Sequence, residues 1–159
     1  MKSVKSFILG LFLLLAACST DKTLSTEEQL AKDVATIDKY LADNGITTAL
    51  KDPSGLRYVV TTAAPAGAKM PLLTSQISVK YVGKLMSTGV AFDSHPTTAV
   101  TFPSLTGLIQ GWQIGFQLLG KGSVATLYIP SGLGYGTTGS GPIPANANLI
   151  FDVTLVDVK

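Results

Sequence analysis

The residues best suited to form a binding site lie in the C-terminal two-thirds of the chain, and most of them are aromatic. Trp112, the chain's only tryptophan, follows a glycine, and Tyr135 stands between two glycines. Tyr81 lies in a β-rich segment, and Phe92 is directly followed by the carboxylate of Asp93. Apolar rings with a few polar groups are typical of concave sites that bind an apolar ligand and orient it by hydrogen bonds. The sequence therefore predicts an apolar cavity with a few polar side chains in its wall.

Residues for covalent or metal-assisted chemistry are scarce. His95 is the only histidine; it falls in a predicted loop and has no spaced histidine or cysteine with which to share a metal. Cys18 is the only cysteine, which excludes an intramolecular disulfide, and the chain has no Gly-x-Ser-x-Gly motif. The glycines of residues 132–141 are not followed by the Gly-Lys-Ser/Thr of a phosphate-binding loop, and they predict a flexible flap instead. We therefore expect no metal and no other cofactor.

Six segments, taken together and in order, resemble the FKBP-type peptidyl-prolyl cis–trans isomerases. They are Ile77–Leu85, Phe92–Ser94, Leu108–Trp112, Ile129–Gly136, Ile143–Pro144 and Leu149–Val153, and the resemblance runs from Gln76 to Lys159. It implies an α+β fold, in which a twisted antiparallel β-sheet wraps around one short α-helix with the ligand site between them. It also implies peptidyl-prolyl isomerase activity on Pro-containing polypeptides, with macrolide inhibitors as a further ligand class.

The resemblance implies a role for each matched side chain. Trp112 would form the floor of the pocket beneath the proline ring. Tyr135 and the backbone N–H of Ile109 would donate hydrogen bonds to substrate carbonyls, and Asp93 would hold the polar side of the site through a bond to Tyr81. The walls would come from Tyr81, Phe92, Leu108, Ile109 and Phe151, and Ile143 would close the rim. A bulky aromatic that the family often has in the strand before the Trp motif has no certain match here, since counting back reaches Val100 and the nearest aromatic is Phe102.

Prolyl isomerisation suits this residue set because it requires neither a nucleophile nor a metal. Its barrier of about 18–20 kcal/mol arises from amide resonance, and a site lowers that barrier by binding the twisted amide more tightly than the planar one. Two other functions remain open: a non-enzymatic chaperone or adaptor that holds Pro-containing segments, and a tethered domain that carries a small apolar ligand. Tyr135 and Asp93 favour the enzyme, since a purely apolar carrier needs neither.

The N-terminal segment predicts export and anchoring. Lys2 and Lys5 precede an almost purely apolar stretch, residues 7–17, which is typical of a signal peptide. Leu15–Cys18 resembles a bacterial lipobox, so we expect residues 1–17 to be removed, Cys18 to carry the lipid, and residues 18–24 to form a tether. An ordinary signal peptide with a chance cysteine is the alternative.

The charge balance and the residue after Cys18 indicate how the protein is attached to a membrane, and to which one. Without residues 1–17, ten basic side chains balance ten acidic ones, which argues against nucleic-acid binding and leaves membrane attachment to the lipid. Ser19 is not the aspartate that often signals inner-membrane retention in enterobacteria. We therefore expect a lipid-anchored protein of the bacterial cell envelope, at the outer membrane and facing the periplasm.

The segment 25–46 predicts an amphipathic helix over residues 26–43. Ser25 to Glu28 has the pattern of a capping box. Apolar residues then follow at helical spacing and form one narrow stripe, consisting of Leu30, Val34, Ile37 and Leu41. The stripe needs a partner surface, which is either the protein's own domain or a second copy. If it is the domain, deleting residues 19–46 is expected to lower stability and to leave activity largely intact.

The remaining elements are those that hold the site. Residues 47–75 predict a strand at 55–60 and a connector, and residues 76–159 the isomerase domain. Alternation between Ile77 and Leu85 points Tyr81 inward. A short helix is expected at 111–119 and strands at 124–130 and 149–155. Strands dominate without βαβ alternation, which favours an α+β architecture with an antiparallel sheet.

Overall fold

The computed structural model describes residues 24–159, so the predicted signal peptide and the lipidation site at Cys18 lie outside the described residues. Within that range the chain forms two α-helices, one 3₁₀ turn and six strands. In order they are α1 (Thr26–Asp43), β1 (Leu50–Lys51), β2 (Arg57–Thr62), β3 (Ile77–Leu85), β4 (Ala91–Phe102), α2 (Gln110–Gln117), β5 (Val124–Ile129), η1 (Ser131–Leu133) and β6 (Leu149–Val158). Neither described α-helix is long and apolar enough to span a membrane.

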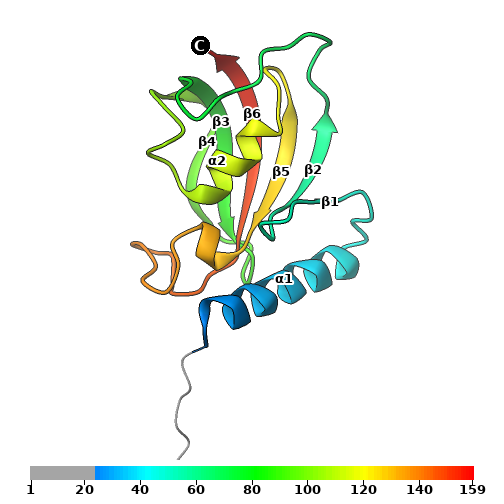
Figure 1. The fold of residues 1–159 in the computed structure, drawn as a ribbon, viewed down its shortest axis with the longest axis vertical. Coiled ribbons are helices and arrows are strands. Elements are labelled where there is room, and N and C mark those ends of the chain that lie inside the picture. Colours follow the sequence, from blue (N-terminus) through cyan, green and yellow to red (C-terminus); the bar gives the residue numbers. More distant parts are fainter. Residues whose placement is uncertain (1–23) are drawn as a thin grey trace, which may run out of the picture.

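The strands form one sheet in the order β1-β2-β5-β6-β3-β4, and all neighbouring strands are antiparallel. The sheet is twisted, and α2 lies in front of it (Figure 1). β2 pairs with β5 from Arg57 opposite Tyr128 to Thr62 opposite Val124, so residues before Gln76 belong to the same sheet. The predicted α+β fold, a twisted antiparallel sheet around one short helix with an N-terminal amphipathic helix, is confirmed.

The close packing of α2 on the sheet depends on two glycines. A Cβ atom on Gly111 would lie 2.5 Å from Cγ2 of Ile129, and one on Gly115 would lie 2.8 Å from Cδ1 of Leu127. Real Cβ atoms do not approach so closely, so a larger residue at either position would push the helix away from β5. Because the glycines let the helix sit against the strand, Trp112 is brought into the main core and is only 4% exposed.

The boundaries of α1 follow the sequence pattern. The hydroxyl of Ser25 accepts the N–H of Glu28 at 3.2 Å, and the Glu28 carboxylate accepts the N–H of Ser25 at 2.9 Å. Both exchanges of the predicted capping box are therefore present. The helix ends at the C-cap Asn44, and Gly45 follows with a φ of 67°, a left-handed conformation that glycine adopts without steric cost.

The apolar stripe of α1 packs against the face of the sheet opposite α2. Ile37 and Leu41 are 0% and 5% exposed and form a second core with Met86, Tyr128 and Ile150. Tyr128 and Ile150 lie next to residues that face α2, so the alternation of a strand directs them to the other side. Docking on the protein's own domain is therefore confirmed for Ile37 and Leu41, whereas Leu30 and Val34 are only half-buried.

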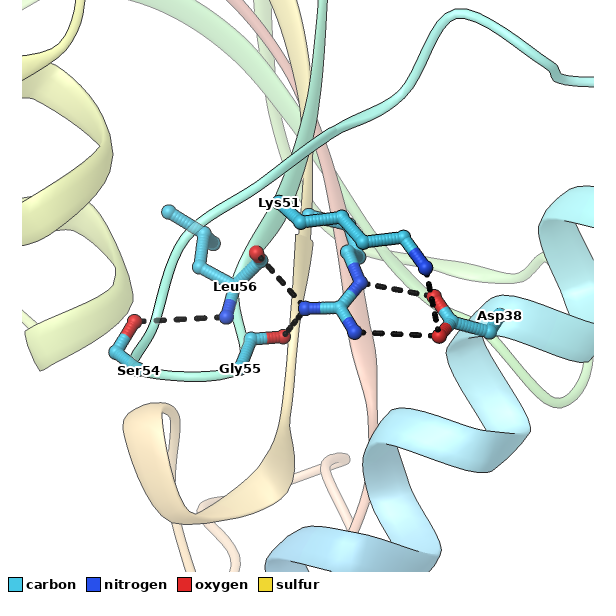
Figure 2. Close-up of polar contacts among 6 residues, drawn as sticks. Asp38, Lys51, Ser54, Gly55 and Leu56 are labelled. Carbon is cyan, nitrogen blue, oxygen red and sulfur yellow. Dashed lines mark hydrogen bonds and ion pairs between the residues drawn. The ribbon is translucent and has the colours of Figure 1, made fainter.

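An ion pair also joins α1 to β2 (Figure 2). Arg57 Nε donates to Asp38 Oδ1 at 2.8 Å, and its Nη2 donates to Oδ2 at 3.2 Å. The third nitrogen, Nη1, donates to the carbonyls of Gly55 and Leu56 at 3.2 and 3.4 Å, and Lys51 Nζ reaches Asp38 at 3.4 Å. This bidentate pairing satisfies the hydrogen-bond donors of the Arg57 guanidinium, which is buried. The hydrogen bond from Arg57 is the main cause that holds the pKa of Asp38 below its usual value.

Candidate functional site

A cavity of about 240 Å³ lies between α2, the strands β3 and β4, and the loop that follows η1. Eight of the nine pocket residues expected from the sequence line it. The lining consists of Tyr81, Phe92, Asp93, Phe102, Gly107, Leu108, Ile109, Trp112, Tyr135 and Phe151. A larger groove of about 520 Å³ lies between the start of α1 and residues 131–137, but its lining contains neither a charged nor an aromatic side chain. The smaller cavity is therefore the better candidate for chemistry.

Trp112 is held at the floor of this cavity by four other aromatic rings. Its ring meets those of Tyr81, Phe102, Phe116 and Phe151 edge to face, with centroid distances of 5.1, 5.5, 5.0 and 5.2 Å. Such contacts are favourable because the positive edge of one ring meets the negative face of the other. The indole N–H is buried and has no hydrogen-bond partner among residues 24–159. The floor is thus rigid and apolar.

The polar wall of the cavity is a hydrogen bond between two strands. Tyr81 of β3 donates its hydroxyl to Oδ2 of Asp93 on β4 at 2.6 Å. Burial of the phenol is the main cause that raises the Tyr81 pKa well above its usual value, and the bond to Asp93 adds to it. Tyr81 therefore stays protonated and directs one carboxylate oxygen toward the cavity wall. The side chain of Asp93 is 49% exposed, so the carboxylate also remains in contact with solvent.

A free backbone donor stands at the start of α2. Ile109 is the N-cap, and its carbonyl accepts the N–H of Trp112 at 2.9 Å and that of Gln113 at 3.1 Å. The N–H of Ile109 itself has no partner within the described part of the chain, as is usual for the first turn of a helix. Gln113 Nε2 donates to the carbonyl of Leu108 at 2.7 Å and so fixes the peptide that carries this N–H.

Tyr135 faces the cavity from the loop after η1. The loop is shaped by the carbonyl of Ser131, which accepts the N–H groups of Gly134 and Gly136 at 3.0 and 2.8 Å. Burial raises the pKa of Tyr135, and the negative charge of Asp93 contributes. The Tyr135 hydroxyl makes no hydrogen bond to any residue from 24 to 159. It is therefore a protonated donor that a ligand can use.

The cavity thus combines an apolar floor with two unpaired donors, and its lining contains no serine, threonine, cysteine, lysine or histidine. A model of the FKBP-type peptidyl-prolyl cis-trans isomerase family matches residues 67–156, more than half of the chain. The chain belongs to this family. It is 42% identical over 125 residues to the FKBP-type peptidyl-prolyl cis-trans isomerase FkpA of Aeromonas hydrophila, covering 77% of this chain and 45% of that protein. It is 34% identical over 149 residues to the outer membrane protein MIP of Legionella longbeachae, covering 92% and 61%.

Solved FKBP-family structures share the fold. The crystal structure of FkpA from Escherichia coli superposes with a TM-score of 0.70 at 33% identity, covering 84% of this chain and 62% of that one. A peptidyl-prolyl cis-trans isomerase from Pseudomonas syringae pv. tomato gives a TM-score of 0.68 at 26% identity, covering 86% and 98%. The chain spans about half the length of the first curated relatives that it matches.

One residue expected at the rim of the pocket is not among the residues that line the cavity. Ile143 is 6% exposed and belongs to the main core, and it does not line the cavity. Its N–H and carbonyl exchange hydrogen bonds with Ser140, both at 2.9 Å, in a tight turn. Its side chain is buried in the same core as Tyr81, Trp112 and Phe151, and a role of Ile143 at the rim stays a prediction.

The aromatic wall residue that counting left open is Phe102. Its ring meets Tyr81 at 6.4 Å and Trp112 at 5.5 Å, whereas Val100 does not line the cavity. The pairing of β3 with β4 jumps from Tyr81 opposite His95 to Val79 opposite Val100, so several β4 residues bulge out of register. Counting along the sequence therefore fails here, although the aromatic residue type itself was the correct signal. Gly107 lines the cavity without any signal in the sequence.

His95 lies in a strand and not in the predicted loop. It is part of β4, opposite Tyr81, immediately before the pairing is interrupted. β4 is the edge strand of the sheet, which explains how Pro96 is tolerated within it. The His95 Nε2 atom is 3.4 Å from Asp93 Oδ1, with both side chains about half exposed.

Proposed function

We propose that this chain catalyses the cis–trans isomerisation of Xaa-Pro bonds in polypeptides and so assists protein folding. The observation that carries the proposal is the pairing of the Tyr81–Asp93 hydrogen bond with an aromatic cavity floored by Trp112. Family membership supports it, and so does the presence in one cavity of eight of the nine residues to which the resemblance assigns a role. The roles below are proposals for this chain.

The proline ring sits on Trp112, between the rings of Phe92, Phe102 and Phe151. An apolar wall removes water from the carbonyl oxygen of the amide. Water stabilises the planar amide by bonding to that polarised oxygen, so its removal favours the twisted form. The twisted amide is then bound more tightly than the planar one, and the barrier falls.

The two donors hold the substrate's backbone while the amide turns. The Ile109 N–H and the Tyr135 hydroxyl bind carbonyls on the substrate, so one side of the rotating bond stays fixed. Asp93, oriented by Tyr81, forms the polar side of the site. Each tenfold gain in rate requires only about 1.4 kcal/mol of selective stabilisation. A few such contacts therefore suffice, without acid–base chemistry.

The test is a protease-coupled assay on an Xaa-Pro tetrapeptide with the purified domain. We expect measurable kcat/KM in the wild type. Tyr135→Phe removes one substrate hydrogen bond and is expected to lower kcat/KM by about twofold to tenfold. Asp93→Leu is expected to cost at least as much, because it also leaves the Tyr81 hydroxyl without its acceptor. An inactive wild type that still suppresses aggregation of an unfolded protein would favour the chaperone alternative.

We further propose the location and ligands that the sequence suggests. Cys18 is the lipid anchor, residues 1–17 are removed, and the mature domain faces the periplasm from the outer membrane. A relative bears the name outer membrane protein MIP, which supports an envelope location. Macrolide inhibitors are the expected competitive ligands of the cavity. The division into an N-terminal helix at 25–46, a strand and connector at 47–75, and an isomerase domain from 76 stays part of this proposal, with the strand at 57–62 completing the sheet of that domain.

A further inference from the structure

A buried carboxylate on α1 makes no ion pair within the described residues. Asp33 is 2% exposed, and its Oδ2 accepts both the N–H of Ser131 at 2.9 Å and the Ser131 hydroxyl at 2.5 Å. Its other oxygen, Oδ1, accepts Nε2 of Gln29 at 2.7 Å. Burying a carboxylate is costly unless hydrogen bonds replace its water. The two donors of Ser131 therefore hold this residue against α1, while Gln29 satisfies the other carboxylate oxygen from within the helix.

Ser131 is in turn the anchor of the loop that carries Tyr135. It is 1% exposed, and its carbonyl accepts the N–H groups of Gly134 and Gly136, the two neighbours of Tyr135. Ser131 is thus bonded to Asp33 of the helix through its N–H and hydroxyl, and through its carbonyl to the N–H groups on both sides of Tyr135. The side-chain oxygen of Asn148 shares the Ser131 N–H at 3.2 Å, so the hydroxyl bond is the one that Asp33 alone accepts. A shift of Ser131 would be passed through the two hydrogen bonds of its carbonyl to the residues that flank Tyr135.

We propose that Asp33 is a positioning residue for Tyr135, and that α1 is therefore part of the support of the isomerase site. The inference rests on the proposed function, because it gives the Tyr135 hydroxyl a role in binding substrate. It also changes the expectation that α1 can be deleted with little effect on activity. Removing α1 removes the carboxylate that holds Ser131.

The same helix provides a matched control. Asp38 also joins α1 to the sheet through hydrogen bonds, but its partners are Arg57 on β2 and Lys51 on β1 (Figure 2). Within the described residues it makes no hydrogen bond to residues 131–136, the loop that carries Tyr135. Asp38→Ala should weaken the docking of α1 without moving Ser131. A difference in kcat/KM between Asp33→Ala and Asp38→Ala then reports on the position of the Tyr135 loop and not on weaker docking of α1.

The first experiment measures kcat/KM on the tetrapeptide. Asp33→Ala is expected to lower kcat/KM by about twofold to tenfold. The loss should not exceed that of Tyr135→Phe, which removes the hydrogen bond from Tyr135 altogether. Asp38→Ala should match the wild type, and Asp33→Asn should retain most activity because its amide oxygen can still accept from Ser131. In a Tyr135→Phe background, Asp33→Ala should cause little further loss. Equal losses in the two alanine variants, or full additivity with Tyr135→Phe, would overturn the inference.

The second experiment does not depend on activity. Amide hydrogen exchange at Gly136 should be faster in Asp33→Ala than in the wild type, and unchanged in Asp38→Ala. If Asp33→Ala does not fold, Ser131→Ala removes only the hydroxyl donor and should show a smaller change of the same kind. Unchanged exchange at Gly136 in every folded variant contradicts the inference. An inactive wild type contradicts the proposed function instead, and exchange then decides the inference alone.

Discussion

Gly83 offers a steric test of the cavity that changes no polar group. It lies on the inward face of β3, opposite Asp93 on one side and Phe151 on the other. A Cβ atom there would be 2.6 Å from Cε1 of Phe151 and 2.8 Å from Cε2 and Cζ of Phe92. Ordinary contacts begin at 3.4 Å, so the Phe151 ring would have to move by 0.8 Å to restore one. Both rings line the cavity, where they meet edge to face.

The expected cost of Gly83→Ala is set by two opposing effects. Overpacking a well-filled core costs about 1–3 kcal/mol. Alanine in a strand loses less conformational entropy than glycine, which returns roughly 0.5–1 kcal/mol. We therefore expect a net loss in the free energy of unfolding of about 0–2.5 kcal/mol. The effect on kcat/KM should be larger, about tenfold or more, because a displacement near 1 Å in a site is costly to catalysis.

Urea unfolding and the tetrapeptide assay measure the two effects separately. Ser78→Thr is the control, since it adds one methyl group to the opposite face of the same strand and keeps the hydroxyl that bonds to Thr101. It should leave both quantities unchanged. A Gly83→Ala variant with wild-type kcat/KM would show that the positions of Phe92 and Phe151 do not govern the reaction. That result would refute the account of the cavity given above.

Three further outcomes are expected. Asp38→Asn should lower the melting temperature by a constant amount above about pH 5. The difference from the wild type should shrink below about pH 4. The reason is that Asp38 has a lowered pKa in the folded state, so its carboxylate loses its stabilising effect as the pH falls. Thermal scans across this range check it. The kcat/KM of the wild type should be constant from pH 6 to 8, because burial raises the pKa values of Tyr81 and Tyr135 and keeps both hydroxyls protonated. A bell-shaped dependence of kcat/KM on pH would contradict this. Cys18→Ser should abolish acylation, so palmitate incorporation by the variant would disprove the lipid anchor.

Local patterns in the sequence determined the elements and much of the site. The capping box and the apolar spacing of α1 depend on neighbours three or four residues apart, and the inward direction of Tyr81 depends on alternation within one strand. Trp112 and Tyr135 could be singled out because their ring types stand next to glycines. Each of these signals lies within a few residues of the feature that it predicts, so no knowledge of the fold is needed.

Contacts between distant residues were decided only by the tertiary structure. Phe102 reaches the cavity because β4 bulges against β3, and no spacing within β4 indicates where the register shifts. Ile143 turns into the core through its backbone bonds to Ser140. Asp33 bonds to Ser131, which lies 98 positions further along the sequence. In the sequence itself, Asp33 cannot be told apart from an aspartate on the exposed face of a helix. Burial and pairing arise from packing between elements, and a linear pattern does not record which elements pack together.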